Sequence, residues 1–329
     1  MAEKYFITGA TGLVGSYITH TLIGEGKEVY ALKRKNSNLQ PLASINEKIN
    51  WVEGDILDVS LLSDAMQGMT YVVHSAASVS MLAKDKEQTF KINIEGTANV
   101  VNAALANGVK KFCHVSSIAA IGVPEKATLI NEKVSWNDDS KDFIYAKSKH
   151  YAEREVWRGI AEGLNAVIIN PSTVLGVCPL DRSSGQIINF ISKGVHYYPQ
   201  GSINLVDAED VAEIVVRLLH SEVHSEKFIL NAANVSYKDF FTKVSHQLDK
   251  PAPKHGIGRN MLKIIYLLSK VANLFGISKV ALSKEIISAI QSTHTYDNAK
   301  IVKLLDYQFK SWEESVAKTC QPLNLSETI

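Results

Sequence analysis

Short apolar runs alternate with longer helix-like segments through the first 170 residues of the chain. Runs that resemble buried strands are residues 4–8, 28–32, 49–53, 70–74, 111–116 and 165–170. Helical patterns between them cover residues 13–25, 58–67, 87–108 and 142–163. Parallel neighbours need a long return connection, so this alternation predicts parallel strands joined by crossover helices. Several runs are apolar throughout, as in a sheet covered on both faces. We therefore predict a Rossmann-type, doubly wound parallel α/β sheet.

The second half of the chain is less regular. After a segment rich in Pro, Gly and Ser, the pattern predicts a strand at 203–206, a capped helix at 207–221, a strand at 227–230 and mostly helices over 236–321. The chain is thus expected to leave the sheet, return briefly and leave again.

This organisation predicts two interleaved domains. We expect a dinucleotide-binding Rossmann domain over residues 1–175, rejoined by residues 203–232. A smaller, mostly helical substrate-binding part is expected over residues 176–329.

Composition narrows the class of protein. The chain has 329 residues, 46% of them hydrophobic and 21% charged, which is typical of a soluble globular protein. Because 35 basic residues face 34 acidic ones, nothing favours a nucleic-acid or anionic-membrane partner. Cys113, Cys178 and Cys320 have no metal-ligand spacing, and they indicate reduced thiols in a cytoplasmic protein. The start of the chain lacks the pattern of a secretion signal.

No stretch reaches the roughly 18 uncharged apolar residues of a membrane span. The nearest candidate, residues 261–275, is interrupted by Lys263 and Lys270. We expect a helix there that buries its apolar face against the rest of the protein; a membrane-surface helix is the alternative. The ten histidines show no metal-ligand spacing, and His74 and His114 are expected to be core or loop residues.

A glycine triplet follows the first strand and opens the first helix. Gly9, Gly12 and Gly15 stand in ITGATGLVGSYI. One glycine permits a tight turn, one lets the backbone approach a pyrophosphate, and one lets helix pack on strand. The helix N-terminus also aims N–H groups at phosphates, so the neighbouring Thr11, Leu13 and Val14 join the predicted site. A purely structural turn is the alternative.

The end of the second strand bears on the choice of dinucleotide. NAD sites usually place a carboxylate there to bind the ribose 2′-OH, but this chain has Lys33, Arg34 and Lys35. A guanidinium can bind a 2′-phosphate through two hydrogen bonds. We expect NADP, with Arg34 as the best single contact and Lys33 beside it. NAD remains possible, and a solvated basic loop is the other interpretation.

Tyr145 and Lys149 form Y-x-x-x-K in a helical pattern, which places both on one helix face. A nearby ammonium and a positive nicotinamide ring would lower the pKa of a phenol and make it an acid-base group. Ser117 lies in SSIAAIG at the end of a predicted strand, where ligands bind in such sheets. It could donate a hydrogen bond to a substrate oxygen, or it could satisfy loop backbone.

Together these motifs resemble the extended short-chain dehydrogenase/reductase family, also called the NAD-dependent epimerase/dehydratase family. The ordered set is TGATGLVG, GDILD, HSAAS, NIEGT, VSSIAAIG, YAKSK, NPSTVLG and VDAEDVA, and it covers nearly the whole chain. The resemblance implies that Ser117, Tyr145 and Lys149 are catalytic and that Lys149 also binds the nicotinamide ribose.

The resemblance also implies further cofactor-binding positions. Asp55 and Ile56 match the pair that contacts adenine. Ser75, Ala76 and Ala77 match the loop under the dinucleotide, which Asn93 orders. The remaining cofactor positions are Ser116, Pro171 and Ser172, the last two near the nicotinamide amide.

Two departures point to a branch of the family. Sugar-nucleotide members carry an arginine for the diphosphate before the VDD-like segment, and here that position is Ile203, followed by Asn204. The usual tyrosine after the catalytic serine is Ile121. The pattern is more similar to dihydroflavonol-reductase-like members, which reduce ketones or aldehydes with NADPH. Arg182 or Arg259 could still replace the missing cation.

Three functions follow from these observations. The first is an NAD(P)-dependent oxidoreductase that reduces a ketone or aldehyde, or oxidises the alcohol. The alternatives are a nucleotide-sugar epimerase or dehydratase, and a non-catalytic NADP-binding redox sensor. Segments 78–86, 177–202 and 251–290 are expected to line the pocket for a small-molecule substrate. The resemblance also implies a homodimer through helices 87–108 and 142–163.

Overall fold

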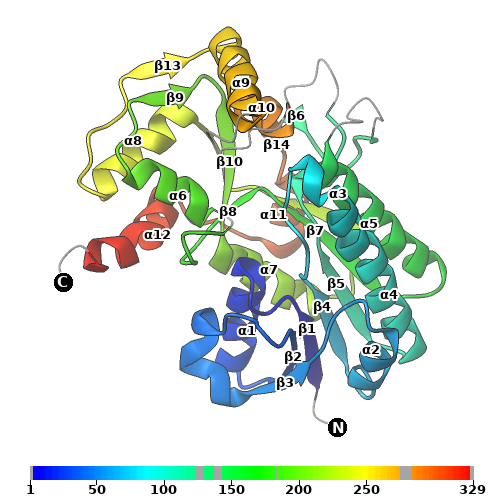
Figure 1. Cartoon of the computed structure of the whole chain (residues 1–329). Helices are drawn as coiled ribbons and strands as arrows, with labels where there is room; N and C mark the ends of the chain where they lie inside the picture. The colour runs from blue at the N-terminus through cyan, green and yellow to red at the C-terminus, as the bar shows by residue number, and fades with distance from the viewer. Residues whose placement is uncertain (1–2, 124–128, 137–142, 183, 275–283, 327–329) are drawn as a thin grey trace.

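A computed structural model describes residues 3–123, 129–136, 143–182, 184–274 and 284–326 of the chain. Its centre is a seven-stranded parallel sheet with strand order β3-β2-β1-β4-β5-β7-β11 (Figure 1). The strands are β1 (Lys4–Thr8), β2 (Glu28–Lys33), β3 (Ile49–Glu53), β4 (Tyr71–His74), β5 (Lys111–Val115), β7 (Ala166–Pro171) and β11 (Glu226–Leu230). The order changes direction between β1 and β4, the place where open α/β sheets bind ligands. The predicted Rossmann-type fold is confirmed.

Helices cover both faces of this sheet. On one face α1 (Leu13–Gly24) packs against α7 (Ala208–Leu219), and on the other lie α2 (Val59–Ala65), α4 (Gly96–Ala106) and α5 (Ile144–Ala161). Along β1, Tyr5 and Ile7 enter the hydrophobic core between the sheet and α1 with α7. Phe6 enters the core on the other face, with α2, α4 and α5. The strand is apolar throughout because each of its faces meets a helical layer.

The predicted helix over 87–108 has an irregular centre. It consists of α3 (Lys86–Phe90), a π-helical segment (Lys91–Glu95) and α4. A π segment widens the helical turn, and such segments are frequent at functional sites. Asn93 lies in it with 1% of its surface exposed.

A second layer lies beyond the carboxyl ends of the strands. Here β10 (Ser202–Asp207) pairs with β8 (Thr173–Leu175) and with β12 (Ala233–Ser236). The strand predicted at 203–206 therefore exists, but in a separate sheet, whereas α7 and β11 lie with the main one. Around this sheet pack α6 (Gly185–Ser192), α8 (Tyr237–Gln247) and α12 (Trp312–Ser326).

Short elements that the sequence pattern missed complete this part. Two parallel pairs are β9 (Tyr197–Pro199) with β13 (His255–Ile257), and β6 (Leu129–Ile130) with β14 (Thr295–Tyr296). The remaining helices are α9 (Arg259–Leu274), α10 (Lys284–Gln291) and α11 (Ala299–Leu305). Over the described ranges, no helix has both the length and the apolar character needed to cross a bilayer.

Candidate active site

The three glycines of the first turn have different neighbours. Gly9 has φ +75°, and a Cβ there would lie 2.5 Å from the backbone nitrogen of Ala76. A Cβ on Gly15 would lie 2.1 Å from the carbonyl oxygen of Gly9. At Gly12 a Cβ would meet only that same oxygen, at 3.2 Å. Two glycines are thus required by packing inside the protein, whereas Gly12 is exposed and leaves room for a ligand to approach the backbone.

Gly12 is also the N-cap of α1, and no side chain caps this helix end. The first turn holds no acidic residue. The first N–H groups of a helix have no partner within it, so those at Leu13 and Val14 are available to an anion. This arrangement fits the pyrophosphate of a dinucleotide.

The loop after β4 is held against this turn. The carbonyl oxygen of Thr8 accepts hydrogen bonds from the backbone N–H of Ser75 at 3.1 Å and from its hydroxyl at 2.8 Å. Farther along, the Asn93 side chain accepts from the N–H of Ser78 at 2.7 Å and donates to its carbonyl at 3.0 Å. Ala76 and Ala77 lie between these anchors, and Ala77 is exposed.

At the ends of β2 and β3 the basic residues differ in their contacts. Lys33 forms an ion pair with Glu53 at 3.1 Å. Arg34 is exposed, and within the described part of the chain its guanidinium has no acidic partner. In the loop after β3, Asp55 accepts the N–H of Leu57 at 3.0 Å and Ile56 is buried. Arg34 is therefore a basic side chain available to a ligand here, as is the exposed Lys35 that follows it.

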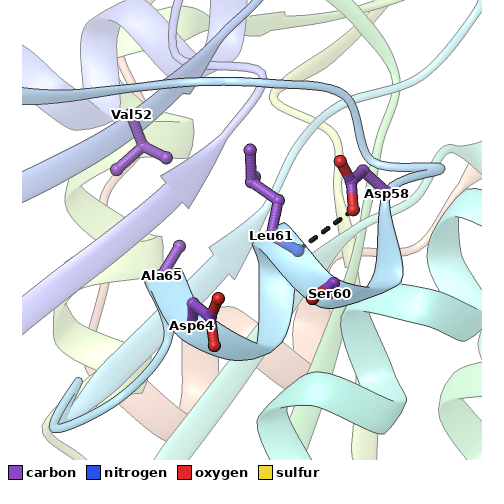
Figure 2. Close-up of a pocket in the computed structure, with 6 residues that line it drawn as sticks. All are labelled: Val52, Asp58, Ser60, Leu61, Asp64 and Ala65. Atoms are coloured by element: carbon purple, nitrogen blue, oxygen red, sulfur yellow. Dashed lines mark hydrogen bonds between the residues drawn. The ribbon is translucent and has the colours of Figure 1, made fainter.

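A surface hollow lies beside this loop (Figure 2). Its lining residues are Val52, Asp58, Ser60, Leu61, Asp64 and Ala65. Asp58 caps α2 by accepting the N–H of Leu61 at 3.0 Å. The hollow contains none of Ser117, Tyr145 and Lys149, which we call the proton-handling group, so it is a separate feature.

The predicted catalytic residues converge at the end of β5. The Ser117 hydroxyl lies close enough to the Tyr145 phenol for hydrogen bonding to lower the pKa of the phenol. The Lys149 ammonium donates to the carbonyl of Val115 at 2.9 Å. The Ser117 hydroxyl also accepts the N–H of Ala119 at 3.1 Å, so it serves the loop and faces the phenol at once.

Burial dominates the acid-base properties of this group. It raises the pKa of Tyr145, which the Ser117 hydrogen bond lowers and the charge of Glu285 raises further. Among the chain's own groups, desolvation outweighs the favourable contacts; our expectation of a lowered phenol pKa included the positive nicotinamide ring and stays a prediction. Burial lowers the pKa of Lys149 to about 8, against the opposing effect of the Glu153 carboxylate.

Glu153 is a buried acid that the sequence analysis missed. Its side chain is 3% exposed and accepts the Ser116 hydroxyl at 2.6 Å and the Asn170 amide. Burial raises its pKa, an effect that these two bonds and the charge of Lys149 oppose. One signal was available: Glu153 lies four residues after Lys149, so it continues the helix face that begins at Tyr145.

Glu285 of α10 was also missed. Its carboxylate accepts the backbone N–H of Tyr145 at 3.2 Å and that of Ala146 at 3.0 Å. The side chain is 6% exposed, and burial raises its pKa. Glu285 thereby caps the helix that carries Tyr145. Because 140 residues separate the two, no local pattern could have indicated this contact.

Two buried histidines, His74 and His114, lie close enough to Lys149 for its charge to lower their pKa values. His74 bonds Thr8 Oγ1 at 2.7 Å and Thr97 Oγ1 at 2.9 Å, and burial lowers its pKa to about 3. The ring of His114 is 5.2 Å away, and neither of its nitrogens has a hydrogen-bond partner among the described residues. Burial, then the charge of Lys149, also holds the pKa of His114 well below its usual value. Both rings are therefore neutral.

The second layer contains Ile203 and Asn204, where sugar-nucleotide members of the family carry an arginine for the diphosphate and the residue after it. Ile203 is 4% exposed within an apolar core, and Asn204 donates to the carbonyl of His294 at 2.9 Å. Arg182 is exposed beside Asp181 at 3.8 Å. The side chain of Arg259 lies outside the described residues.

The end of β7 was also predicted to contact the cofactor. Pro171 is the last residue of this strand, and Ser172 follows it with 7% of its surface exposed. The Ser172 hydroxyl is buried, and no hydrogen-bond partner for it exists among the described residues. Next to it, Asn170 holds both Glu153 and the carbonyl of Ser117. This strand end is thus linked to the proton-handling group.

An open glycine turn at a sheet switch point, beside a Ser–Tyr–Lys group, defines an NAD(P)-dependent enzyme of the extended short-chain dehydrogenase/reductase type. The model of the NAD dependent epimerase/dehydratase family matches residues 5–233. The chain belongs to this family, as the sequence motifs predicted.

Similar proteins include both reductases and epimerases. The chain is 30% identical to the "Putative dihydroflavonol 4-reductase" of Synechocystis sp., over 96% of this chain and 93% of that protein. It is 28% identical to cinnamoyl-CoA reductase 1 of Petunia hybrida, over 68% and 71% of the two chains. The crystal structure of a nucleoside-diphosphate-sugar epimerase from Pseudomonas aeruginosa superposes with a TM-score of 0.81 at 20% identity, covering 100% of this chain and 99% of the other. That last likeness shows the fold alone.

Proposed function

We propose that the protein is an NADP-dependent carbonyl reductase or alcohol dehydrogenase. The observation that carries the proposal is the convergence of Ser117, Tyr145 and Lys149 at the end of β5. The glycine turn after β1 stands two strands away, since β4 separates β1 from β5. When bound, a nicotinamide dinucleotide would supply or accept the hydride.

The chain's own residues would move the proton. Tyr145 would donate its phenolic proton to the substrate oxygen in reduction, and take it back in oxidation. Ser117, whose hydroxyl lies near that phenol, would hold the same oxygen. Lys149 would stabilise the phenolate and bind the nicotinamide ribose, with its ammonium held in place by the carbonyl of Val115.

Other residues would hold the dinucleotide. The turn of Gly9, Thr11, Gly12 and Gly15, with the N–H groups of Leu13 and Val14, would bind the pyrophosphate. Adenine would lie beside Asp55 and Ile56, and the loop of Ser75, Ala76 and Ala77, ordered by Asn93, would lie under the dinucleotide. Ser116, Pro171 and Ser172 would line the nicotinamide end.

Arg34 supports the choice of NADP over NAD. Lys33 is paired with Glu53, whereas the guanidinium of Arg34 is exposed at the end of β2 and can form two parallel hydrogen bonds, which the neighbouring Lys35 cannot. A 2′-phosphate would gain charge-assisted hydrogen bonds there.

The second layer favours an uncharged carbonyl substrate over a sugar nucleotide. At the position where sugar-nucleotide members carry arginine, this chain has Ile203, buried in an apolar core. A diphosphate needs a cation that this position does not offer. We also retain the proposals that residues 176–329 contribute the substrate side and that the protein forms a homodimer.

Turnover of the cofactor tests the proposal. The purified protein is incubated with NADPH and a panel of ketones and aldehydes, and the loss of reduced nicotinamide is followed. A reductase consumes NADPH stoichiometrically with substrate, and Tyr145→Phe should lower the rate about 10²–10⁴-fold while NADPH still binds. Conversion of a nucleotide sugar without net NADPH loss would establish the epimerase or dehydratase alternative. Tight NADPH binding without any turnover would support a sensor.

A further inference from the structure

Helix α9 presents apolar side chains on two faces. Leu262 is 6% exposed, and Ile265 and Tyr266 on the same side are half-buried. On the outer side, Met261 and Ile264 are each 55% exposed and Leu267 is 63% exposed. The expectation that this helix buries its apolar face is therefore only half right, because it has a second one in contact with water.

The outer residues form one surface. Successive residues of an α-helix advance by about 100° around its axis, so Met261, Ile264 and Leu267 lie within about 120° of one another. We call these three residues the outer face of α9. Figure 1 shows α9 at the end of the molecule opposite the N-terminus. Exposed apolar patches of this kind mark sites of interaction with proteins or membranes.

The sequence segment that contains α9 carries charge of one sign. Between Asp249 and Glu285, residues 250–284 contain seven Lys or Arg residues and no Asp or Glu. Among the described ones, Lys254 and Lys263 are exposed. We expected no anionic partner because the net charge of the whole chain is near zero. That net charge hides the excess of basic residues in this segment.

We propose that the outer face of α9, with Lys254 and Lys263, binds the surface of a bilayer that contains anionic lipids. An exposed apolar stripe flanked by lysines is how interfacial helices bind membranes: the apolar side chains enter the headgroup boundary and the cations contact lipid phosphates. The paucity of acidic residues matches an anionic surface better than a second copy of this chain, whose own α9 would bring like charges together.

The same layer reaches the candidate active site. Helix α9 packs against α10, and α10 supplies Glu285, which holds the N–H groups of Tyr145 and Ala146. The proposed membrane-binding helix is thus joined through one neighbour to the helix that carries Tyr145. The inference does not depend on which reaction the site performs.

Vesicle cosedimentation of the full chain tests the proposal. Binding to phosphatidylcholine vesicles that contain phosphatidylglycerol should exceed binding to phosphatidylcholine alone by about tenfold, and salt should weaken it. The double variants Ile264→Ser/Leu267→Ser and Lys254→Gln/Lys263→Gln should each lose about tenfold in partitioning.

Matched controls lie elsewhere on the surface. Val59 is 56% exposed on α2, and Lys48 is exposed before β3. Val59→Ser and Lys48→Gln should bind vesicles like the wild type, and circular dichroism should show all variants folded. Absence of vesicle binding by the folded wild type would overturn the proposal. So would equal binding by the α9 variants, or self-association that the Ile264→Ser/Leu267→Ser variant abolishes, because the face would then be an interface between copies.

Discussion

The glycine turn allows stability to be separated from cofactor binding at neighbouring positions. The perturbation is Gly15→Ala, compared with Gly12→Ala. The new Cβ at Gly15 would lie 2.1 Å from the oxygen and 2.7 Å from the carbon of the Gly9 carbonyl. At Gly12 the new Cβ would meet a single atom at 3.2 Å, and the backbone there (φ −82°, ψ 170°) suits alanine.

The expected magnitudes follow from these distances. Alanine within a helix is normally favoured over glycine by about 1 kcal/mol, which Gly15→Ala would gain if it fitted. Overpacking costs about 1–3 kcal/mol, and here the upper end applies because the clashing atoms are backbone that cannot rotate away. The net loss at Gly15 is about 2 kcal/mol. At Gly12, where alanine is a slightly poorer N-cap than glycine, we expect about 0.5 kcal/mol.

Two assays separate the variants. Urea unfolding followed by circular dichroism gives the free energy of unfolding, and fluorescence titration with NADPH gives affinity. Gly15→Ala should lose both stability and affinity. Gly12→Ala should lose only about 0.5 kcal/mol of stability but at least about tenfold in affinity, since one methyl group would occupy the approach of the pyrophosphate. Wild-type NADPH affinity in Gly12→Ala, or equal destabilisation of both variants, would refute the reasoning.

Three further predictions concern charge. Arg34→Glu should weaken NADPH binding about thirtyfold, the equivalent of about 2 kcal/mol of charge-assisted hydrogen bonding, and leave NADH binding unaffected. An equal loss of affinity for NADPH and NADH would contradict the assignment of Arg34 to the 2′-phosphate. Lys48→Gln is the control. Lys149→Met should be inactive yet more stable than the wild type at neutral pH. Burial lowers the pKa of Lys149 from 10.5 to about 8, so the charged ammonium lowers the free energy of unfolding of the wild type. Wild-type stability should accordingly rise between about pH 8 and the unfolded pKa, as the folded lysine loses its proton first, and unfolding of Lys149→Met should lack this rise. Glu285→Gln removes a charge that raises the pKa of Tyr145, so the pH profile of alcohol oxidation should shift to lower pH; an unshifted profile would mean that Glu285 does not act on the phenol.

The sheet and the short-range chemistry could be predicted from local sequence patterns. The strand–helix alternation, the glycine triplet and the pair Tyr145 and Lys149 are all local, because a backbone turn or one helical turn sets the relevant spacing. The short strands β6, β9, β13 and β14 were missed since two or three residues cannot show a period. We expected the strand at 203–206 to rejoin the Rossmann domain, but it pairs in a separate sheet, because a strand's own residues do not identify its partner.

The surroundings of the acid-base group come from segments that are distant in the sequence and meet in the folded chain. Glu285 reaches Tyr145 from 140 residues away, and burial raises the pKa of the phenol against the effect of Ser117. The exposed side of α9 was equally hidden, since periodicity predicts that a helix has an apolar face but not whether the fold covers it. Desolvation and long-range contacts depend on which segments the chain brings together, and no local pattern contains that information.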